Sequence, residues 1–226
     1  MHVELQTQPA VTPVWPMLRT LGVIATISGL LVVLADQITQ PMIADKQRIL
    51  TERLVFQVVP GAVSKRDFIV TPEGQLEPAA SGATGDPLYA AYDADGQLKA
   101  VAIVGVGGGY AGPVQVMFAY DPGCQCIVGS KVLKSNETPG FGDKLDTDPA
   151  FRENFKALDA RIDTAAMALA NPIVTVKHGT KTEAWQIDAI TGATISSRAM
   201  GKAANQAAQR AAPAIQRDLA KLMQPN

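Results

Sequence analysis

The chain has few of the residues on which metal and nucleic-acid chemistry commonly depend. Its 226 residues include two cysteines, two histidines and only 5% aromatic residues. A zinc or iron–sulfur site needs about four ligands, and this chain offers only Cys124 and Cys126 close together. The formal net charge is −1 with both signs interspersed, whereas nucleic-acid binding favours a basic face and stacking aromatic residues. We therefore expect no metal centre built by this chain alone and no nucleic-acid partner.

The two cysteines stand in a Cys-x-Cys arrangement within residues 121–126. In an oxidising compartment they can pair with each other in a tight loop, or they can simply pack in the domain. A metal site shared with another subunit is the third alternative. The two histidines, His2 and His178, have no partner at ligand spacing, so a cysteine pair or packing is favoured over metal.

One apolar run near the N-terminus is long enough to cross a membrane. Residues 20–35 carry no charge, and extension back to Val14 gives about 33 Å of helix at about 1.5 Å per residue. The hydrocarbon core is about 30 Å thick, and Trp15 and Arg19 suit its interface. Residues 34–37 lack a small-x-small cleavage site, which favours an uncleaved anchor over a signal peptide. We predict a transmembrane anchor at residues 14–36.

The charges that flank this run predict its orientation. Arg19 lies on the N-terminal side and Asp36 on the other, and the positive-inside rule places the more basic flank in the cytoplasm. We expect residues 1–13 to form a short cytoplasmic N-terminus and residues 37–226 to form one domain in the periplasm. The protein would then be a single-pass protein of a bacterial inner membrane.

The exported part is predicted to be an α+β domain, with a twisted antiparallel sheet and flanking helices. Runs rich in β-branched residues alternate with turns, and helical patterns lie before and after them. The predicted strands are residues 66–71, 88–92, 98–106, 114–120 and 127–133. The predicted helices are residues 41–58, 149–158 and 195–212, the last resuming after Pro213.

The most informative segment is residues 188–194, which read Asp-Ala-Ile-Thr-Gly-Ala-Thr. Gly192 permits a tight turn, and a helix is predicted from Ile195. The unpaired N–H groups and the dipole of a helix N-terminus stabilise phosphate, so the Thr194 hydroxyl is placed to contact a phosphate or to be esterified to one. A second Ser-Gly-Ala-Thr at residues 81–84 is followed by Gly-Asp-Pro and is typical of a surface loop.

Two further segments carry glycines in informative patterns. Residues 107–112 fit Gly-x-Gly-x-x-Gly, but a strand pattern follows where the dinucleotide fingerprint needs a helix. A glycine-rich bend, or a backbone that lets a flat ring approach closely, are the interpretations that remain. Residues 137–142 read Glu-Thr-Pro-Gly-Phe-Gly, with proline and glycine at type II turn positions. This loop is either an ordinary turn or one whose amides face a ligand.

Together these segments resemble the FMN-binding domain shared by the G subunit of the Rnf electron-transport complex and the C subunit of the sodium-translocating NADH:quinone reductase. In that family the last threonine of the heptad carries FMN through a phosphoester bond, a Gly-Tyr-x-Gly-Pro segment precedes it, and a Glu-Thr-Pro-Gly-Leu-Gly loop lies between. Phe141 is a mild departure from that loop. The resemblance implies covalent FMN on Thr194, with the other cofactor-binding residues at Asp188, Thr191, Gly192, Ala193, Tyr110, Glu137, Thr138 and Gly140.

The resemblance also implies a function and partners. The chain would relay electrons within a complex that links ferredoxin, NAD and ion translocation, with other membrane and redox subunits as partners and no turnover of its own. A separate flavin transferase would attach the FMN, with Asp188 serving its recognition or orienting the loop. Residues 137–144 resemble those of the Rnf protein more than those of its quinone-reductase relative. The first alternative is the C subunit of a sodium-translocating NADH:quinone reductase. The others are a membrane-anchored hydrolase using Ser196, Ser197 or His178, and a non-redox assembly subunit.

Overall fold

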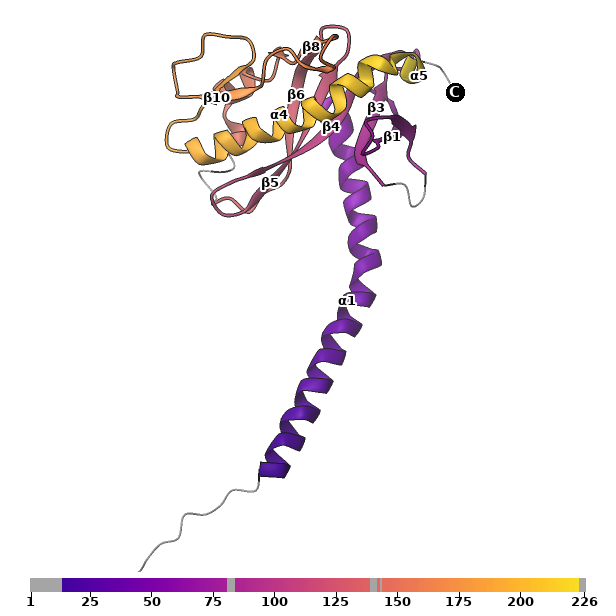
Figure 1. The fold of residues 1–226 in the computed structure, drawn as a ribbon, viewed down its shortest axis with the longest axis vertical. Coiled ribbons are helices and arrows are strands. Elements are labelled where there is room, and N and C mark those ends of the chain that lie inside the picture. The colour runs from indigo at the N-terminus through magenta and orange to yellow at the C-terminus, as the bar shows by residue number, and fades with distance from the viewer. Residues whose placement is uncertain (1–13, 81–83, 139–141, 143, 224–226) are drawn as a thin grey trace, which may run out of the picture. The chain divides into compact units, whose positions relative to one another are not determined.

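The structure is a computed structural model that describes residues 14–80, 84–138, 142 and 144–223, with the backbone alone at residues 41–45, 47 and 48. It divides into two compact units, Met1–Ile49 and Leu50–Asn226. The predicted cytoplasmic residues 1–13 and the predicted site residue Gly140 lie outside the described residues. Figure 1 shows the fold and labels several of its helices and strands.

The first unit consists of most of helix α1 (Val14–Val58). Its stretch Val14–Gln40 is long and apolar enough to cross a membrane, and its described side chains are exposed. The sequence predicted an anchor at residues 14–36 and a helical stretch at residues 41–58 that continues from it. The structure has one continuous helix through both, and Pro41 does not interrupt it.

The second unit is built on a sheet whose described strands run antiparallel in the order β2-β1-β3-β4-β5-β6-β7. Neighbouring strands are mostly consecutive in the sequence and are joined by short turns, which is typical of a meander. The α+β class is therefore confirmed. The strands of this sheet are β1 (Ser64–Val70), β2 (Leu76–Pro78), β3 (Asp86–Tyr92), β4 (Leu98–Gly108), β5 (Pro113–Asp121), β6 (Cys126–Lys134) and β7 (Leu158–Asp159).

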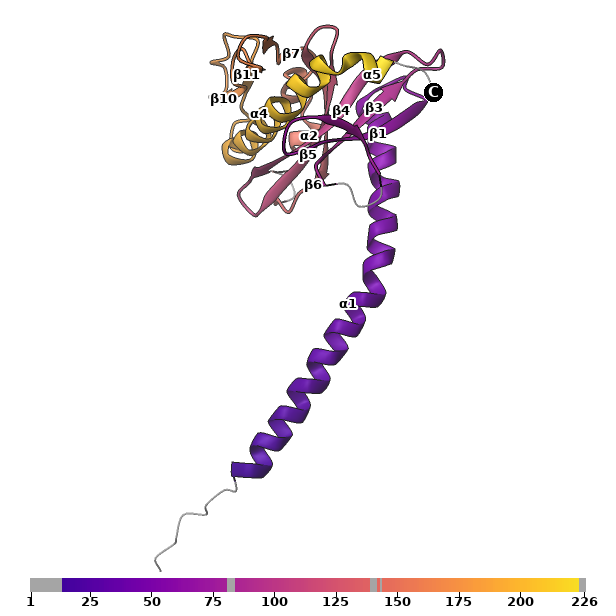
Figure 2. The same ribbon diagram turned by 45° about the vertical axis from the view of Figure 1, so that its right-hand side comes forward.

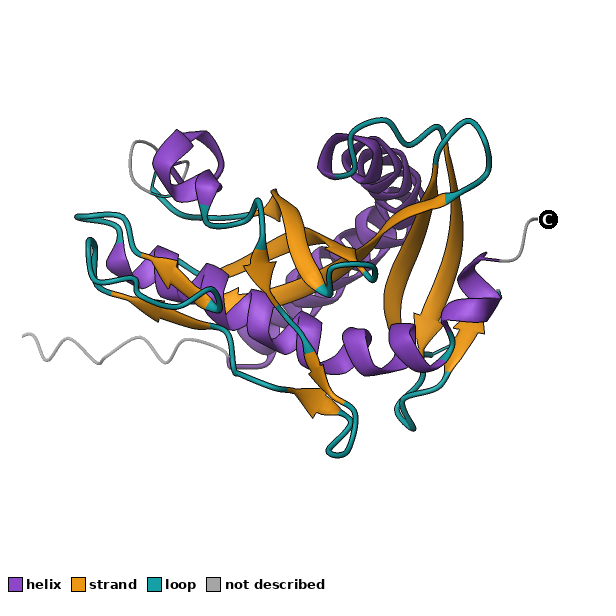
Figure 3. Cartoon of the chain, turned by 90° about the horizontal axis from the view of Figure 1, so that it is seen from above, coloured by secondary structure: helices purple, strands orange, loops and turns teal. Residues whose placement is uncertain are grey.

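Smaller elements complete this unit, and one long helix crosses the sheet. Helix α4 packs mainly on β4 and β5, as the views in Figure 2 and Figure 3 show. The remaining elements are α2 (Lys144–Thr147), α3 (Pro149–Glu153), β8 (Ile162–Asp163), β9 (Ala168–Leu169), β10 (Val174–Val176), β11 (Gln186–Asp188), α4 (Thr194–Arg217) and α5 (Leu219–Met223).

The two faces of the sheet bury different sets of side chains, as the period of two in a strand requires. On β4, Val101 and Ile103 join the larger core beneath α4, while Ala100 and Ala102 join a smaller core. That smaller core also contains Val55, Val58 and Val59, from and just beyond the end of α1. The sheet is thus covered on both faces, which explains why its central strands are apolar on both sides.

Helix α4 approaches β4 very closely because small residues line both surfaces. A Cβ atom added to Gly107 would clash with the carbonyl oxygen of Ala199, and one added to Gly105 would clash with that of Ala203. Ala199 and Ala203 are themselves fully buried. Gly105 and Gly107 therefore admit a helix backbone, which is neither of the two interpretations that the sequence left open for residues 107–112, a glycine-rich bend or the close approach of a flat ring. Gly108, next along β4, has open space around it.

The helix predicted at residues 149–158 is wrong in its second half. Asp148 caps α3 by accepting hydrogen bonds from the N–H groups of Ala150 and Phe151, but α3 ends at Glu153. Asn154 turns its side-chain amide back to the carbonyl oxygen of Phe151 at 2.9 Å. Leu158 then begins β7 at the edge of the sheet. The helix α4 continues through Pro213 to Arg217 without a break.

Candidate functional site

The N-terminus of α4 presents backbone N–H groups that the preceding residue does not cap. Thr194 is the first residue of the helix, and Ala193 at the N-cap makes no side-chain hydrogen bond to the first turn. Gly192 has a φ of 82°, in the left-handed region that favours glycine. Thr194 is half-exposed. The heptad thus ends as the sequence predicted, with a helix start that lacks its own anionic or polar cap.

Ser197 fixes the loop that leads into this helix. Its Oγ accepts a hydrogen bond from the N–H of Ile190 at 3.0 Å and donates one to the carbonyl oxygen of Ala193 at 2.9 Å. Ser197 is fully buried, so both bonds are shielded from water. The loop between β11 and α4 is therefore held against the first turn of the helix.

A cavity of about 490 Å³ opens beside Thr194. It brings together three segments that are distant in the sequence: the turn between β4 and β5, the loop after β6, and the start of α4. Tyr110 is 77% exposed at its edge, and Ile195 is 50% exposed. The residues that line the cavity are Tyr110, Glu137, Thr138, Gly192, Ala193, Thr194, Ile195 and Ser196.

Glu137 connects these three segments. Its Oε1 accepts a hydrogen bond from the N–H of Ala111 at 2.8 Å, and its Oε2 accepts one from the hydroxyl of Ser196. Burial alone would raise the pKa of the Glu137 carboxyl, but the bonds from Ser196 and from the backbone of Ala111 and Tyr110 together outweigh it and lower that pKa. Glu137 is therefore a carboxylate at neutral pH.

Two glycines make room for this carboxylate. A Cβ atom on Gly109 would lie 2.5 Å from Oε1 of Glu137, and one on Gly142 would clash with the Cβ atom of Glu137. Glycine is required at both positions for Glu137 to reach its partners. Gly109 and Gly142 thus leave the space that the Glu137 side chain fills between the two loops.

Asp188 and Thr191 do not face the cavity beside Thr194. They line a neighbouring cavity of about 240 Å³, together with His178. Oδ1 of Asp188 accepts a hydrogen bond from the N–H of Gly179 at 2.7 Å, and Oδ2 lies 3.3 Å from Nδ1 of His178. Asp188 therefore ties the turn after β10 to the strand β11 that leads into the heptad.

Asn154 is a site residue that no sequence pattern predicted. It is 6% exposed, and its Oδ1 accepts hydrogen bonds from the N–H of Asp188 at 2.9 Å and from Nζ of Lys181 at 3.2 Å. Its Nδ2 lies 3.3 Å from the carbonyl oxygen of Asp188. A single buried asparagine thus holds the backbone of the heptad's first residue, and no local signal marks it.

The sequence points to Ser196 only as a possible nucleophile, although its position two residues after Thr194 places it in the first turn of α4. Its hydroxyl is engaged by Glu137 and that of Ser197 by the backbone. Nδ1 of His178 lies in the neighbouring cavity, 3.0 Å from the carbonyl oxygen of Ala189. A Ser–His–Asp arrangement needs the histidine at the hydroxyl, and these contacts do not provide it.

The residues at the cavity fit a phosphate-linked flavin. The uncapped N–H groups of α4 suit a phosphate monoanion or diester, and the Thr194 hydroxyl stands at that helix end. The cavity beside it combines apolar and polar side chains, as small-molecule sites do.

Cys124 and Cys126 form a disulfide, which confirms the pairing alternative for these cysteines. The part of the chain that the structure describes contains no cluster of three or more metal-binding side chains.

Comparison with known proteins finds a family and several relatives that this chain resembles. Residues 109–209 match the FMN-binding domain family. The G subunit of the Na⁺-translocating ferredoxin:NAD⁺ oxidoreductase complex of Acetobacterium woodii is 28% identical over 216 residues, covering 91% of this chain and 97% of that protein. The G subunit of the ion-translocating oxidoreductase complex of Stutzerimonas stutzeri is 29% identical over 201 residues, covering 87% of this chain and 82% of that protein.

A solved structure shares the fold. The crystal structure of NqrC from Shewanella oneidensis superposes with a TM-score of 0.52 at 21% identity, covering 75% of this chain and 87% of that one. The matched residues 109–209 span the Tyr110 turn, the Glu137 loop and the start of α4, which are the three segments that form the cavity. Residues 109–209 of this chain are therefore similar to the FMN-binding domain family, and they contain the whole lining of the cavity.

Proposed function

We propose that this chain is the electron-carrying G-type subunit of a membrane-bound ion-translocating oxidoreductase complex, with one FMN joined to Thr194 through a phosphoester bond. The observation that carries the proposal is the uncapped start of α4 at Thr194, beside a cavity that Tyr110 and Glu137 also line. The similarity to G subunits over most of both chains supports the choice of complex.

The N-terminal turn of α4 holds the phosphate in this proposal. Its free N–H groups donate hydrogen bonds, and the helix dipole adds attraction of about 0.3–1 kcal/mol at an exposed helix end. Neither contribution is strong enough to retain a cofactor in a dilute compartment. A covalent bond to the Thr194 oxygen removes the dependence on affinity, because the flavin can no longer dissociate.

The walls of the cavity orient the flavin ring. FMN, when bound, supplies reversible electron transfer. Tyr110 and Ile195 offer apolar surface at the edge of the cavity, where both are exposed. Thr138 offers a hydroxyl and a backbone amide, and the Glu137 carboxylate keeps the two loops at fixed positions. We also assign Gly192 and Ala193 to the phosphate end, and Gly140 to the loop of Thr138.

Asp188 and Thr191 act on the loop in this proposal. Asp188 holds the turn at Gly179 and is itself held by Asn154, so it presents the heptad in one conformation. A flavin transferase that uses FAD would then recognise the loop with Thr194 already at the helix end. Asp188 and Thr191 remain accessible from the neighbouring cavity, which leaves them available to that enzyme.

The proposed topology places the flavin outside the cytoplasm. Residues 1–13 are cytoplasmic, residues 14–36 cross the bacterial inner membrane, and residues 37–226 form the periplasmic FMN-binding domain. The candidate membrane helix Val14–Gln40 supports a single crossing. Arg19 near its N-terminal end and Asp36 near its C-terminal end favour this orientation. The partners are the other membrane and redox subunits, which pass electrons between ferredoxin and NAD while ions are translocated.

A single gel tests the covalent assignment. The full chain is expressed with a flavin transferase, denatured and separated by electrophoresis, and flavin fluorescence is recorded in the band. We expect fluorescence in the wild-type protein and in Thr84→Val, and none in Thr194→Val, because only Thr194 stands at a helix start. Thr84 is the matched control, since β3 follows it where α4 follows Thr194.

The outcomes separate the alternatives. A fluorescent Thr194→Val band refutes attachment at Thr194. A colourless wild-type protein, despite an active transferase that labels a known substrate in the same cells, favours a non-redox assembly subunit. Thr194→Ser retains a hydroxyl at the same place, and we expect its band to fluoresce.

A further inference from the structure

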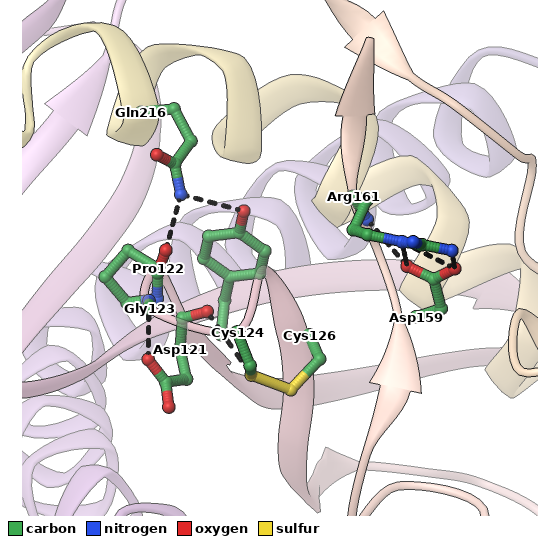
Figure 4. Close-up of a disulfide and its surroundings, with 9 residues drawn as sticks. Asp121, Pro122, Gly123, Cys124, Cys126, Asp159, Arg161 and Gln216 are labelled. Carbon is green, nitrogen blue, oxygen red and sulfur yellow. Dashed lines mark hydrogen bonds and ion pairs between the residues drawn. A yellow bond between two sulfur atoms is a disulfide. The ribbon is translucent and has the colours of Figure 1, made fainter.

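The disulfide between Cys124 and Cys126 lies at an exposed turn between β5 and β6. Cys124 is exposed, whereas Cys126 is 9% exposed and begins β6. Figure 4 shows the bond beside the turn at Asp121 and Gly123, with Gln216 reaching the turn from α4. One cysteine of the pair thus lies at the surface, and the other is buried in the sheet.

Contacts other than the disulfide also hold this turn. Asp121 and Cys126 are partners in the β5–β6 ladder, and Oδ1 of Asp121 accepts a hydrogen bond from the N–H of Gly123 at 2.7 Å. Nε2 of Gln216 donates to the carbonyl oxygen of Pro122 at 2.8 Å. The chain entropy that a disulfide removes grows with the loop it closes, and this one joins residues only two apart. It therefore adds little to the stability of the domain.

The residue enclosed by the disulfide has an uncommon backbone. Gln125 has a φ of 51°, one of two non-glycine residues with a positive φ among those described. Such a conformation is unfavourable for a residue with a side chain. Its carbonyl oxygen accepts a hydrogen bond from the N–H of Ala160 at 3.0 Å, and its Oε1 accepts one from the N–H of Ile162 at 2.9 Å. Ring closure and these bonds together keep Gln125 there.

We propose that Cys124–Cys126 is a redox-active disulfide that exchanges with the dithiol of a thiol–disulfide oxidoreductase. Exposed disulfides and those that hold an unfavourable backbone are the labile ones, whereas structural disulfides resist reduction. The proposal rests on three observations: the surface position of Cys124, the small loop that the bond closes, and the left-handed Gln125. None of these depends on the flavin.

The exchange proceeds in two balanced steps. A partner thiolate attacks Sγ of Cys124 and forms a mixed disulfide, while Sγ of Cys126 leaves as a thiolate and takes a proton from water. The partner's second thiolate then attacks the partner's first sulfur, which is bonded to Cys124 in the mixed disulfide. This step releases Cys124 as a thiolate, which is also protonated. Overall, two electrons and two protons pass from the partner's dithiol to Cys124 and Cys126, and the partner becomes the disulfide.

This redox site is separate from the proposed flavin site. The Tyr110 turn precedes β5 and the Cys124 turn follows it, so the two lie at opposite ends of that strand. The eight steps from Pro113 to Asp121 span about 27 Å at about 3.4 Å per residue. We therefore expect the disulfide to behave identically in the flavin-free Thr194→Val variant, and this separates a failure here from a failure of the proposed function.

A glutathione titration of the full chain in detergent tests the proposal. The protein is equilibrated with buffers of graded reduced-to-oxidised ratio, quenched with acid, and labelled with a maleimide whose mass counts free thiols. Because the chain has only two cysteines, every label reports this bond. We expect reduction within the range of these buffers and an unchanged circular dichroism spectrum. A bond that stays closed in reduced glutathione, or a domain that unfolds when it opens, overturns the proposal.

Two single variants test which sulfur is attacked. Cys126→Ser leaves the exposed thiol of Cys124, and Cys124→Ser leaves the buried thiol of Cys126. Because reactivity follows access and thiolate character, we expect Cys126→Ser to form a mixed disulfide with oxidised glutathione at least about tenfold faster than Cys124→Ser. Equal rates would overturn the assignment of Cys124 as the attacked sulfur.

Discussion

Replacing Gly107 by alanine places a methyl group between β4 and α4, at a point where neither side can yield by rotating a side chain. The nearest atoms to the new Cβ belong to the backbone of Ala199, with its carbonyl carbon at 2.6 Å and its Cα at 3.0 Å. Carbon atoms in contact lie about 3.5–4.0 Å apart. The helix must therefore move away from the sheet by about 1 Å.

The cost of this movement follows from the packing around α4. Its buried face consists mainly of alanines and is fully enclosed by the sheet, so a shift opens gaps along its length. Overpacking a core costs about 1–3 kcal/mol. The clash here is between the new methyl group on the backbone of β4 and the backbone of α4, so we expect a cost at the upper end of this range. We expect Gly107→Ala to lower the free energy of unfolding by about 3 kcal/mol, which for a domain of this size lowers Tm by about 6–12 °C.

Urea unfolding of the full chain in detergent measures this effect. The fluorescence of Trp185, half-buried in the domain, reports unfolding in a Trp15→Phe background that removes the tryptophan of the anchor. Gly108→Ala is the matched control, because a Cβ atom there meets nothing within 4 Å, and we expect a change within about 0.5 kcal/mol. If Gly107→Ala unfolds like the wild-type protein, the close approach of α4 to β4 is refuted.

Two further variants test the loops around Thr194. Ser197→Ala leaves the buried N–H of Ile190 without its acceptor. We expect the free energy of unfolding in urea to fall by about 1–3 kcal/mol and hydrogen exchange at that amide to become faster. Unchanged exchange would contradict the role of Ser197. Glu137→Gln removes a carboxylate whose pKa is lowered in the folded state by Ser196 and the Ala111 amide. That contribution is present above the unfolded carboxyl pKa of about 4.3 and is lost as the pH falls through the folded value. Unfolding measured against pH should therefore show the largest difference from the wild type at neutral pH, shrinking in acid; a difference that grows in acid would contradict this sign.

The sequence predicted well those features that depend on neighbouring residues. The central strands of the sheet are close to their predicted bounds because alternation and turn residues are local signals. The start of α4 was placed within one residue of Thr194 because Gly192 and the pattern after it are also local. The segments of Tyr110 and Glu137 were assigned to the same site from a resemblance, and the structure brings them together around one cavity.

The features that the sequence did not reveal depend on contacts between distant residues. Gly107 faces Ala199, about 90 residues later, and only the packed helix shows why glycine stands there. Asn154 ends α3 and binds Asp188, and an isolated asparagine carries no sign of such a partner. The short parallel pair of β10 and β11 likewise joins segments too brief to have a periodicity of their own.

The place of α4 after the strands β1 to β6 in the sequence sets the order in which the site is assembled. The strands β3 to β6 pair with neighbours in the sequence, and such local contacts form early because little chain must be ordered to close them. The helix that begins at Thr194 is synthesised after all of these strands, and in the folded domain it packs on β4 and β5. The cavity beside Thr194 therefore cannot form before the chain has been synthesised as far as Ser196, because Thr194, Ile195 and Ser196 line it.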